Sequence, residues 1–318
     1  MVAILIPVAA LFLSFGILLA GNGLQGTLLP VRAGIEDFSP FAIGIMGAAF
    51  YMGYILSCFW APRVVARVGH IRSFTVFGTI ASAAQLMHVV WVDPIPWWGL
   101  RFITGACLCG LYMVMESWIN ERAGKEHRGR ILSFYQIVNL GAVTIGQVLL
   151  NLYDPAGFEL FVVASVLVSV ALVPVALTRT TAPQPLQQVR IRIPRVYAIS
   201  PVGVIACLTV GLVNGAVWTI VPLFAQSALT SVAELSLFMS LLIIGGAVFQ
   251  WPLGRWSDLI DRRWVVIVIC VGGGFSALAL MAFGDLARVV MYALAFVYGG
   301  FTFALYAIAI AHANDQAE

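Results

Sequence analysis

Ten long apolar runs follow one another along the chain, and they constrain its fold more than any other feature of the sequence. A hydrocarbon core about 30 Å thick is crossed by about 20 apolar residues of helix. Lipid offers no hydrogen-bond partner to an open strand edge, so each run is expected to be a helix of an all-α polytopic membrane protein. The expected spans cover residues 5–29, 41–62, 73–92, 97–120, 131–151, 158–178, 198–222, 233–254, 264–284 and 288–312.

Composition supports a lipid environment. Of the 318 residues, 61% are hydrophobic and only 10% are charged, and the mean hydropathy is +0.99, whereas a soluble domain carries about 25% charged residues. No basic segment precedes the first run, which is long enough to span a bilayer, so a cleaved signal peptide is not expected. The five cysteines lie inside apolar runs without metal-ligand spacing. They are interpreted as reduced core residues, and no metal or cofactor is expected.

The distribution of basic residues predicts the orientation. All Lys and Arg residues except Arg32, Arg101 and Arg288 lie in alternate loops or in the polar, proline-rich segment 179–197. Basic residues mark the cytoplasmic side of a membrane protein. We therefore expect both termini and the segment 179–197 to lie in the cytoplasm.

The same segment is predicted to be a linker between a six-helix N-terminal bundle, 1–178, and a C-terminal bundle, 198–318. The bundles repeat each other at an offset of 192 residues, which becomes 194 farther along: Asn22 matches Asn214, Gly23 matches Gly215, Pro30 matches Pro222, Gly53 matches Gly245, and Leu111-Tyr112 matches Leu305-Tyr306. The offset holds an even number of spans, so both copies run in the same direction, as in transporters built from parallel repeats. The second copy stops after four spans, so we expect ten helices. We favour truncation before an eleventh and a twelfth helix, and the alternative is a ten-helix variant.

The most specific motif is a charged loop between two apolar runs, QWPLGRWSDLIDRR at residues 250–263. It resembles the loop signature of the major facilitator superfamily, G-x-x-x-D-[RK]-x-G-[RK]-[RK]. The matching places are held by Gly254, Asp258, Arg262 and Arg263. Leu259 and Asp261 depart from the signature, which has a basic residue and a glycine there.

The resemblance implies a gating role for this loop and for its degenerate first copy. That copy keeps Arg67 and Gly69, but Pro62 and Ala66 replace the glycine and the aspartate. In the family, the aspartate stabilises one state by facing a helix start in the opposite half, where a helix N-terminus favours an anion. We expect Asp258 to close the cytoplasmic side in the outward-open state. The alternative is a carboxylate that only balances neighbouring arginines in a solvated loop.

Further segments support the same resemblance: Arg101-Phe-x-x-Gly105, Glu116–Arg122, Arg128–Tyr135 and Ala311–Asp315. Within the superfamily, the chain is similar to the YcaD-like bacterial branch. This implies two parallel, pseudo-symmetric helix bundles, a location in the bacterial inner membrane, a monomeric chain and no nucleic-acid partner. Glu116 lies near the cytoplasmic end of its expected span and is interpreted as a structural ion pair with Arg67 or Arg130.

Polar side chains at one depth of the bilayer suggest a substrate cavity. The expected layer consists of Asn22, Arg101, Gln147 and Asn214; Gln136 and Asn139 lie near the helix face of Gln147, and Tyr51, Tyr54 and Trp218 could add an aromatic wall. A charge at the bilayer centre is costly, so Arg101 is either an interface anchor or a cavity residue with a partner. For each Asn or Gln alone, interhelical hydrogen bonding is the alternative.

These features predict a secondary transporter of a small molecule that works by alternating access. Neutral polar groups with one arginine suit a neutral or anionic substrate. The energy source stays open between uniport and proton coupling through Glu116. The alternative function is a membrane scaffold or assembly factor that retained the fold without transport. The sequence has no Walker loop, H-E-x-x-H or G-x-S-x-G motif, so an enzyme is not expected.

Overall fold

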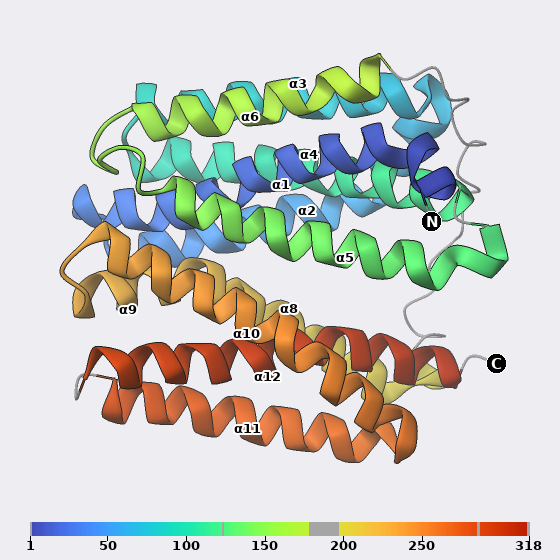
Figure 1. Ribbon diagram of the computed structural model, residues 1–318. Helices are drawn as coiled ribbons and strands as arrows, with labels where there is room; N and C mark the ends of the chain where they lie inside the picture. The colour runs from blue at the N-terminus through green and yellow to red at the C-terminus, as the bar shows by residue number, and fades with distance from the viewer. Residues whose placement is uncertain (1, 123, 178–196, 285–286, 317–318) are drawn as a thin grey trace. The chain divides into compact units, whose positions relative to one another are not determined.

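The computed structural model describes residues 2–122, 124–177, 197–284 and 287–316, with the side chains at 2–8, 120–130, 132, 133 and 314 outside that description. Every secondary-structure element in these ranges is an α-helix (Figure 1). The chain divides into two compact units, Met1–Gln188 and Val189–Glu318. Apart from Tyr197, the predicted linker 179–197 lies outside the described residues.

The helices of the N-terminal unit are α1 (Val2–Ile35), α2 (Pro40–Val68), α3 (His70–Val90), α4 (Pro94–Arg122), α5 (Gly124–Leu149) and α6 (Glu159–Ala176). Those of the C-terminal unit are α8 (Pro201–Thr219), α9 (Val221–Ala228), α10 (Val232–Leu259), α11 (Arg262–Phe283) and α12 (Arg288–Asp315). Within each unit the long helices run alongside one another (Figure 1).

The prediction of ten helices, six plus four, is wrong. The described residues contain eleven bounded helices, because the stretch predicted as one span at 198–222 is divided at Ile220 into α8 and α9. Pro222 has no backbone N–H, so it cannot continue the hydrogen-bond ladder of α8. The C-terminal unit therefore contributes five of these helices instead of four.

Length and hydropathy identify nine membrane-spanning candidates in the described residues. α8 and α9 together form one of them, Pro201–Ala228. α5 is the exception among the long helices, because its apolar part is only Phe134–Leu149. The chain is therefore a multi-pass membrane protein.

α2 and α4 pack backbone against backbone where they cross. A Cβ atom added to Gly53 of α2 would lie 2.0 Å from the carbonyl oxygen of Phe102, and one added to Gly105 of α4 would lie 2.0 Å from that of Phe50. Only residues without a Cβ fit such a contact, and small residues are common where membrane helices pack closely. The two glycines fix the crossing point of α2 and α4.

The C-terminal unit repeats this crossing between α10 and α12. A Cβ on Gly245 would lie 1.9 Å from the carbonyl oxygen of Phe296, and one on Gly299 would lie 1.9 Å from that of Leu242. Gly245 follows Gly53 by 192 residues, and Gly299 follows Gly105 by 194 residues. The internal repeat of the sequence is therefore also a repeat of helix packing.

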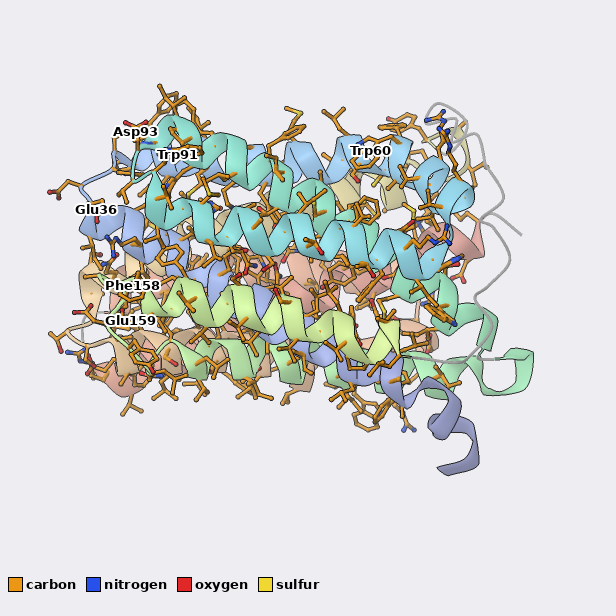
Figure 2. All side chains as sticks on the ribbon, turned by 90° about the horizontal axis from the view of Figure 1, so that it is seen from above. Glu36, Trp60, Trp91, Asp93, Phe158 and Glu159 are labelled. Carbon is orange, nitrogen blue, oxygen red and sulfur yellow. The ribbon has the colours of Figure 1, made fainter. Side chains whose placement is uncertain are left out.

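One end of the N-terminal unit holds the connections from α1 to α2, from α3 to α4 and from α5 to α6. Figure 2 shows at this end Glu36, Trp91, Asp93, Phe158 and Glu159, and Trp60 farther along the bundle. Arg32 of α1 closes the turn before α6: its guanidinium donates hydrogen bonds to the backbone carbonyls of Pro155, Ala156 and Gly157 and pairs with Glu36. Exposed aromatic rings such as Trp91 are typical of a membrane interface.

The glycine crossing predicts a pair of contrasting alanine variants. Gly53→Ala forces the backbones of α2 and α4 apart and should destabilise the folded protein by about 1–3 kcal/mol, the usual cost of overpacking. Gly44→Ala on the same helix is the matched control, because a Cβ there meets nothing within 4 Å. The measurement is thermal unfolding in detergent, and equal unfolding midpoints for the two variants would contradict the crossing.

Candidate functional site

A buried arginine lies on the inner face of α4. Arg101 is only 8% exposed. Its guanidinium carbon lies 4.1 Å from the centre of the Phe50 ring, a cation–π contact. In the part of the chain that the structure describes, no carboxylate pairs with Arg101, and its Nε atom has no hydrogen-bond acceptor. Arg101 is therefore a buried cation with an aromatic neighbour and an unmet hydrogen-bond donor.

Tyrosines continue from Arg101 along α2 and α4. Tyr51 lies close enough to Arg101 to interact with it electrostatically. Tyr112 interacts electrostatically with both Tyr51 and Glu116. Tyr54 of α2 lies near Tyr112 and Glu116. All three tyrosines are half-buried. The three tyrosines therefore lie between the guanidinium of Arg101 and the carboxylate of Glu116.

Tyr135 of α5 completes this arrangement. Its hydroxyl donates a 3.1 Å hydrogen bond to Oε1 of Glu116. Phe15 of α1 stacks on Tyr135 and meets Tyr112 edge-on, with ring centres 4.7 and 5.5 Å apart. We call the six polar residues the polar row: Tyr51, Tyr54, Arg101, Tyr112, Glu116 and Tyr135. Four helices of one unit, α1, α2, α4 and α5, hold it in place.

The polar row has no full counterpart in the C-terminal unit, although the helix crossing is the same. At the repeat offsets, Tyr51 and Tyr54 correspond to Ile243 and Gly246, Arg101 corresponds to Ala295, and Glu116 corresponds to Ile310. Among these positions in α4 and α12, only Tyr112 keeps its residue type, as Tyr306. Packing shared by both units therefore does not require the row.

The residues predicted to share a polar layer with Arg101 lie in different surroundings. Gln147 is fully buried; its amide donates to the carbonyl of Gly23 at 2.9 Å and accepts from the Thr27 hydroxyl at 2.6 Å. These bonds join α5 to α1, the interhelical role given as the alternative. Asn22, Gln136 and Asn139 are half-buried. Their membership of a cavity lining stays a prediction.

Two further members of the predicted layer lie in the C-terminal unit, on α8. Asn214 is half-buried, and its Oδ1 atom is buried without a hydrogen-bond donor. The ring centre of Trp218 lies 6.3 Å from that of Phe303 on α12, in a tilted contact. A cavity role for Asn214 and Trp218 stays a prediction.

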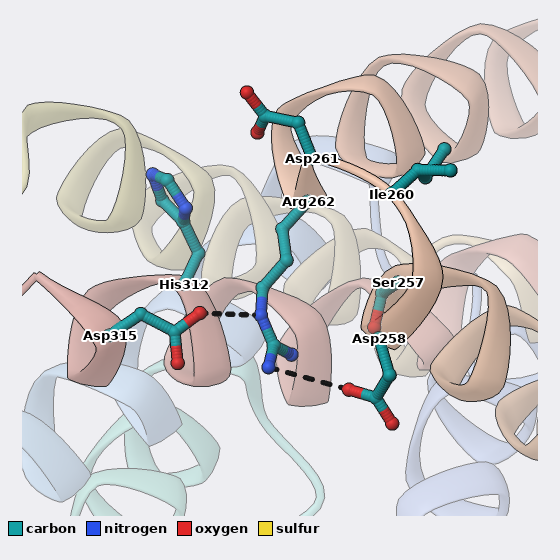
Figure 3. Close-up of a pocket in the computed structure, with 7 residues that line it drawn as sticks. All are labelled: Ser257, Asp258, Ile260, Asp261, Arg262, His312 and Asp315. Carbon is teal, nitrogen blue, oxygen red and sulfur yellow. Dashed lines mark hydrogen bonds and ion pairs between the residues drawn. The ribbon is translucent and has the colours of Figure 1, made fainter.

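Arg262, the first residue of α11, joins three helix ends in the C-terminal unit. Its Nε lies 2.7 Å from Asp315 at the end of α12, and its NH2 nitrogen lies 3.4 Å from Asp258 at the end of α10 (Figure 3). These residues belong to a pocket of about 310 Å³ whose lining is Ser257, Asp258, Ile260, Asp261, Arg262, His312 and Asp315. The side chain of Asp258 is 68% exposed. Asp261, where the family signature has glycine, caps α11 by accepting a hydrogen bond from the backbone N–H of Arg263.

Arg67, Arg130 and Gly69, which were also singled out in the sequence, lie in different surroundings. Arg67 is exposed, and it forms no ion pair with Glu116; the described partner of Glu116 is Tyr135, which reaches it from α5. The side chain of Arg130 lies outside the described residues. Gly69 joins α2 to α3 with φ 87° and ψ 165°, a conformation that is essentially restricted to glycine.

Sequence reasoning named several members of the polar row without placing them together: Arg101 as a cavity residue or interface anchor, Glu116 as a structural ion pair, and Tyr51 and Tyr54 as an aromatic wall. Spacing along one helix places Arg101, Tyr112 and Glu116 on one face of α4. The hydrogen bond from Tyr135 joins two different helices, so helical periodicity alone carries no signal for it. The Phe50 ring is likewise supplied from α2 through the glycine crossing.

Comparison with known proteins decides the family. The model of the Major Facilitator Superfamily matches residues 11–318. The chain belongs to the major facilitator superfamily. Over 314 residues it is 24% identical to YcaD of Escherichia coli, an uncharacterized MFS-type transporter, with 98% of this chain and 81% of that protein covered. Family membership places the chain among membrane transporters rather than enzymes.

Solved structures agree on the fold. A D323A mutant of the nucleoside transporter NupG superposes with a TM-score of 0.79 at 14% identity, covering 96% of this chain and 82% of that one. A bacterial homolog of the human lysosomal transporter Spinster gives 0.76 at 13% identity, over 98% and 78%. A D-xylose–proton symporter gives 0.71 at 15% identity, over 97% and 87%. The chain has the fold of these secondary transporters.

Alanine substitutions of Gly69 and Gly254, the glycines of the two loop motifs, should affect folding stability differently. Gly69→Ala should cost about 1–3 kcal/mol of folding stability through backbone strain alone, since a Cβ there meets nothing within 4 Å. Gly254→Ala places its Cβ in equally open space within a helix and should leave stability unchanged or raise it slightly. Unfolding midpoints in detergent provide the comparison. A Gly69→Ala protein as stable as Gly254→Ala would rule out strain at the α2–α3 junction.

Proposed function

We propose that the chain is a secondary transporter that carries a neutral or anionic small molecule by alternating access, and that Arg101 anchors the substrate. The observation that carries this proposal is the burial of Arg101 without a carboxylate among the described residues. A cation inside the hydrocarbon region costs several kcal/mol and marks a substrate or ion pathway. An entering hydroxyl, carbonyl or carboxylate group would supply the acceptor that its Nε lacks.

The tyrosines of the polar row support a substrate that presents hydroxyl groups or a ring. Phenolic hydroxyls both donate and accept hydrogen bonds, and aromatic faces cover flat apolar surfaces. The nucleoside transporter and the D-xylose–proton symporter of the same fold act on small molecules of this kind. Asn22, Gln136, Asn139, Gln147, Asn214 and Trp218 remain candidates for further lining positions.

We also propose that Glu116 binds the coupling proton. Its described partner is a neutral hydroxyl, that of Tyr135. A carboxylate that is hydrogen-bonded to a neutral group can gain and lose a proton as its surroundings change. Because Glu116 and Arg101 are linked through Tyr112 and Tyr51, occupation of one end of the row can affect the other.

The remaining parts of the proposal concern orientation and gating. The basic loops favour cytoplasmic termini and a bacterial inner-membrane location. The charged segments at the ends of α2 and α10 are the candidate gates, through Arg67, Gly69, Gly254, Asp258, Arg262 and Arg263. Glu116 of α4 and Arg130 of α5 are further candidates. We retain a monomeric chain with bundles at 1–178 and 198–318.

Substitution of Arg101 tests the substrate anchor. Wild-type protein in proteoliposomes is given a panel of radiolabelled nucleosides, pentoses and monocarboxylates, and at least one should accumulate. Arg101→Gln should lower that uptake by about tenfold or more, since loss of a charged hydrogen bond of about 1.5–3 kcal/mol corresponds to such a factor.

Arg288→Gln is the matched control for this experiment. Arg288 is an exposed arginine that pairs with Glu234 at 2.8 Å, and it lies outside the polar row and the loop motifs. Its substitution should leave uptake unchanged. Wild-type uptake by the Arg101→Gln protein would refute the anchor.

Substitution of Glu116 tests proton coupling. Glu116→Gln keeps the side-chain shape but cannot release a proton, so it should abolish uptake driven by a pH gradient while retaining exchange of labelled for unlabelled substrate. A pH-sensitive dye inside the vesicles reports proton movement. Glu234→Gln serves as control, because that half-buried carboxylate lies outside the row and pairs with Arg288 at 2.8 Å. Persistent proton movement in the Glu116→Gln protein would assign coupling to another group.

A further inference from the structure

Two cysteine thiols face each other in the N-terminal unit. Cys58 of α2 and Cys109 of α4 place their Sγ atoms 3.4 Å apart, and both are free thiols. Cys58 is half-buried, and Cys109 is only 3% exposed. Because 51 positions separate them, the sequence alone gives no sign that the two core cysteines meet. In the fold they form a reduced dithiol between two helices.

The helix crossing holds this pair together. Contacts advance along both helices in the same sense, from the 2.9 Å hydrogen bond of the Trp98 indole to the carbonyl of Ala42 to the 2.8 Å hydrogen bond from Ser57 to the carbonyl of Ala106. α2 and α4 are therefore parallel, and the cysteines follow the point of backbone contact. A disulfide needs Cα atoms about 4.4–6.8 Å apart and side chains that point at each other. The Sγ atoms lie 3.4 Å apart, so the side chains meet the second of these demands.

We propose that Cys58 and Cys109 are a redox-reactive pair that closes to an intramembrane disulfide when a hydroperoxide oxidises it. The more accessible Cys58 attacks the peroxide oxygen, which releases an alcohol or water and leaves a sulfenic acid. The sulfur of Cys109 then displaces that hydroxyl as water and forms the S–S bond. Two thiols and one hydroperoxide give one disulfide, one alcohol and one water, so atoms and electrons balance. A low-molecular-weight thiol reverses the step by exchange.

The pair adjoins the polar row. The Cys58 thiol donates to the backbone carbonyl of Tyr54 at 3.4 Å, and Cys109 lies within electrostatic range of Tyr54 and Glu116. A disulfide would fix α2 against α4 beside these groups and would also fix the approach of Tyr51 to Arg101. We therefore expect oxidation to slow transport; this consequence rests on the proposed function, whereas disulfide formation does not.

The C-terminal unit offers no equivalent bond. At the repeat offsets, Gln250 and Phe303 occupy the positions of Cys58 and Cys109. Oxidation would therefore tie only the crossing of α2 and α4. The other three cysteines, Cys107, Cys207 and Cys270, provide an internal reference for thiol reactivity within the same chain.

Thiol counting tests the modification site on the full chain in detergent. After treatment with hydrogen peroxide, acid quenching and denaturation, a polyethylene-glycol maleimide should modify three of the five cysteines instead of five. The intact mass should fall by about 2 Da, the two hydrogens lost on disulfide formation, and dithiothreitol should restore both readings. Cys58→Ser and Cys109→Ser should abolish the protection.

The control is Cys207→Ser, which removes a half-buried thiol of α8 and should leave the protection intact. Five reactive thiols after peroxide would overturn the proposal. Protection that persists in Cys58→Ser, or that dithiothreitol fails to reverse, would also overturn it, because sulfinic acids are not reduced by thiols.

Measurement of substrate uptake tests whether the disulfide controls transport, separately from whether the disulfide forms. With a compound that the reduced wild-type protein carries, uptake should fall on oxidation, recover with dithiothreitol and stay constant in Cys58→Ser. A disulfide that forms without changing this uptake would refute control of transport. Absence of uptake by the reduced protein would count against the proposed function, and thiol counting would then decide the modification site alone.

Discussion

The backbone contact between α2 and α4 is the constraint on which the N-terminal unit depends. Gly53 and Gly105 let carbonyl groups of the facing helix occupy the space of a side chain. Apolar side chains gain little by leaving lipid for protein, so close packing of this kind supplies much of the helix association in a membrane. The contact also sets the rotation of both helices about their axes. That rotation brings Phe50 under Arg101 and Cys58 against Cys109.

The repeat of this crossing in α10 and α12 separates what packing requires from what function requires. Gly245 and Gly299 preserve the contact, so both units use the same helix geometry. The positions around it differ in chemistry: Arg101 corresponds to Ala295, which is fully buried. An alanine suffices for the architecture, whereas an arginine adds the cost of burying a charge. A cost confined to one copy of a repeated structure is best explained by a role in function.

Much of the helical architecture could be predicted from apolar run length, because lipid leaves the backbone few alternatives. The division of α8 from α9 could not. Pro30 and Pro222 occupy the same place in the repeat, yet α1 continues through Pro30 while the chain breaks at Ile220. Proline within a span lowers the cost of a break, and neighbouring packing decides whether one occurs. Contacts such as Tyr135 with Glu116 depend on how far each helix is rotated, which periodicity on a single helix does not specify.

Two arginines of this chain show how surroundings decide the role of one side chain. Arg262 lies at helix ends, partly exposed, with two carboxylates within 3.4 Å. Solvent screening limits such pairs to about 0–1 kcal/mol each, so this cluster serves to hold three helix ends together. Arg101 lies within a span, over an aromatic ring and without an acidic partner among the described residues. In the proposed function, a group of the substrate supplies the hydrogen-bond acceptor that its Nε lacks. Such a position suits a transporter, because a site already neutralised by the protein would have little affinity left for its cargo.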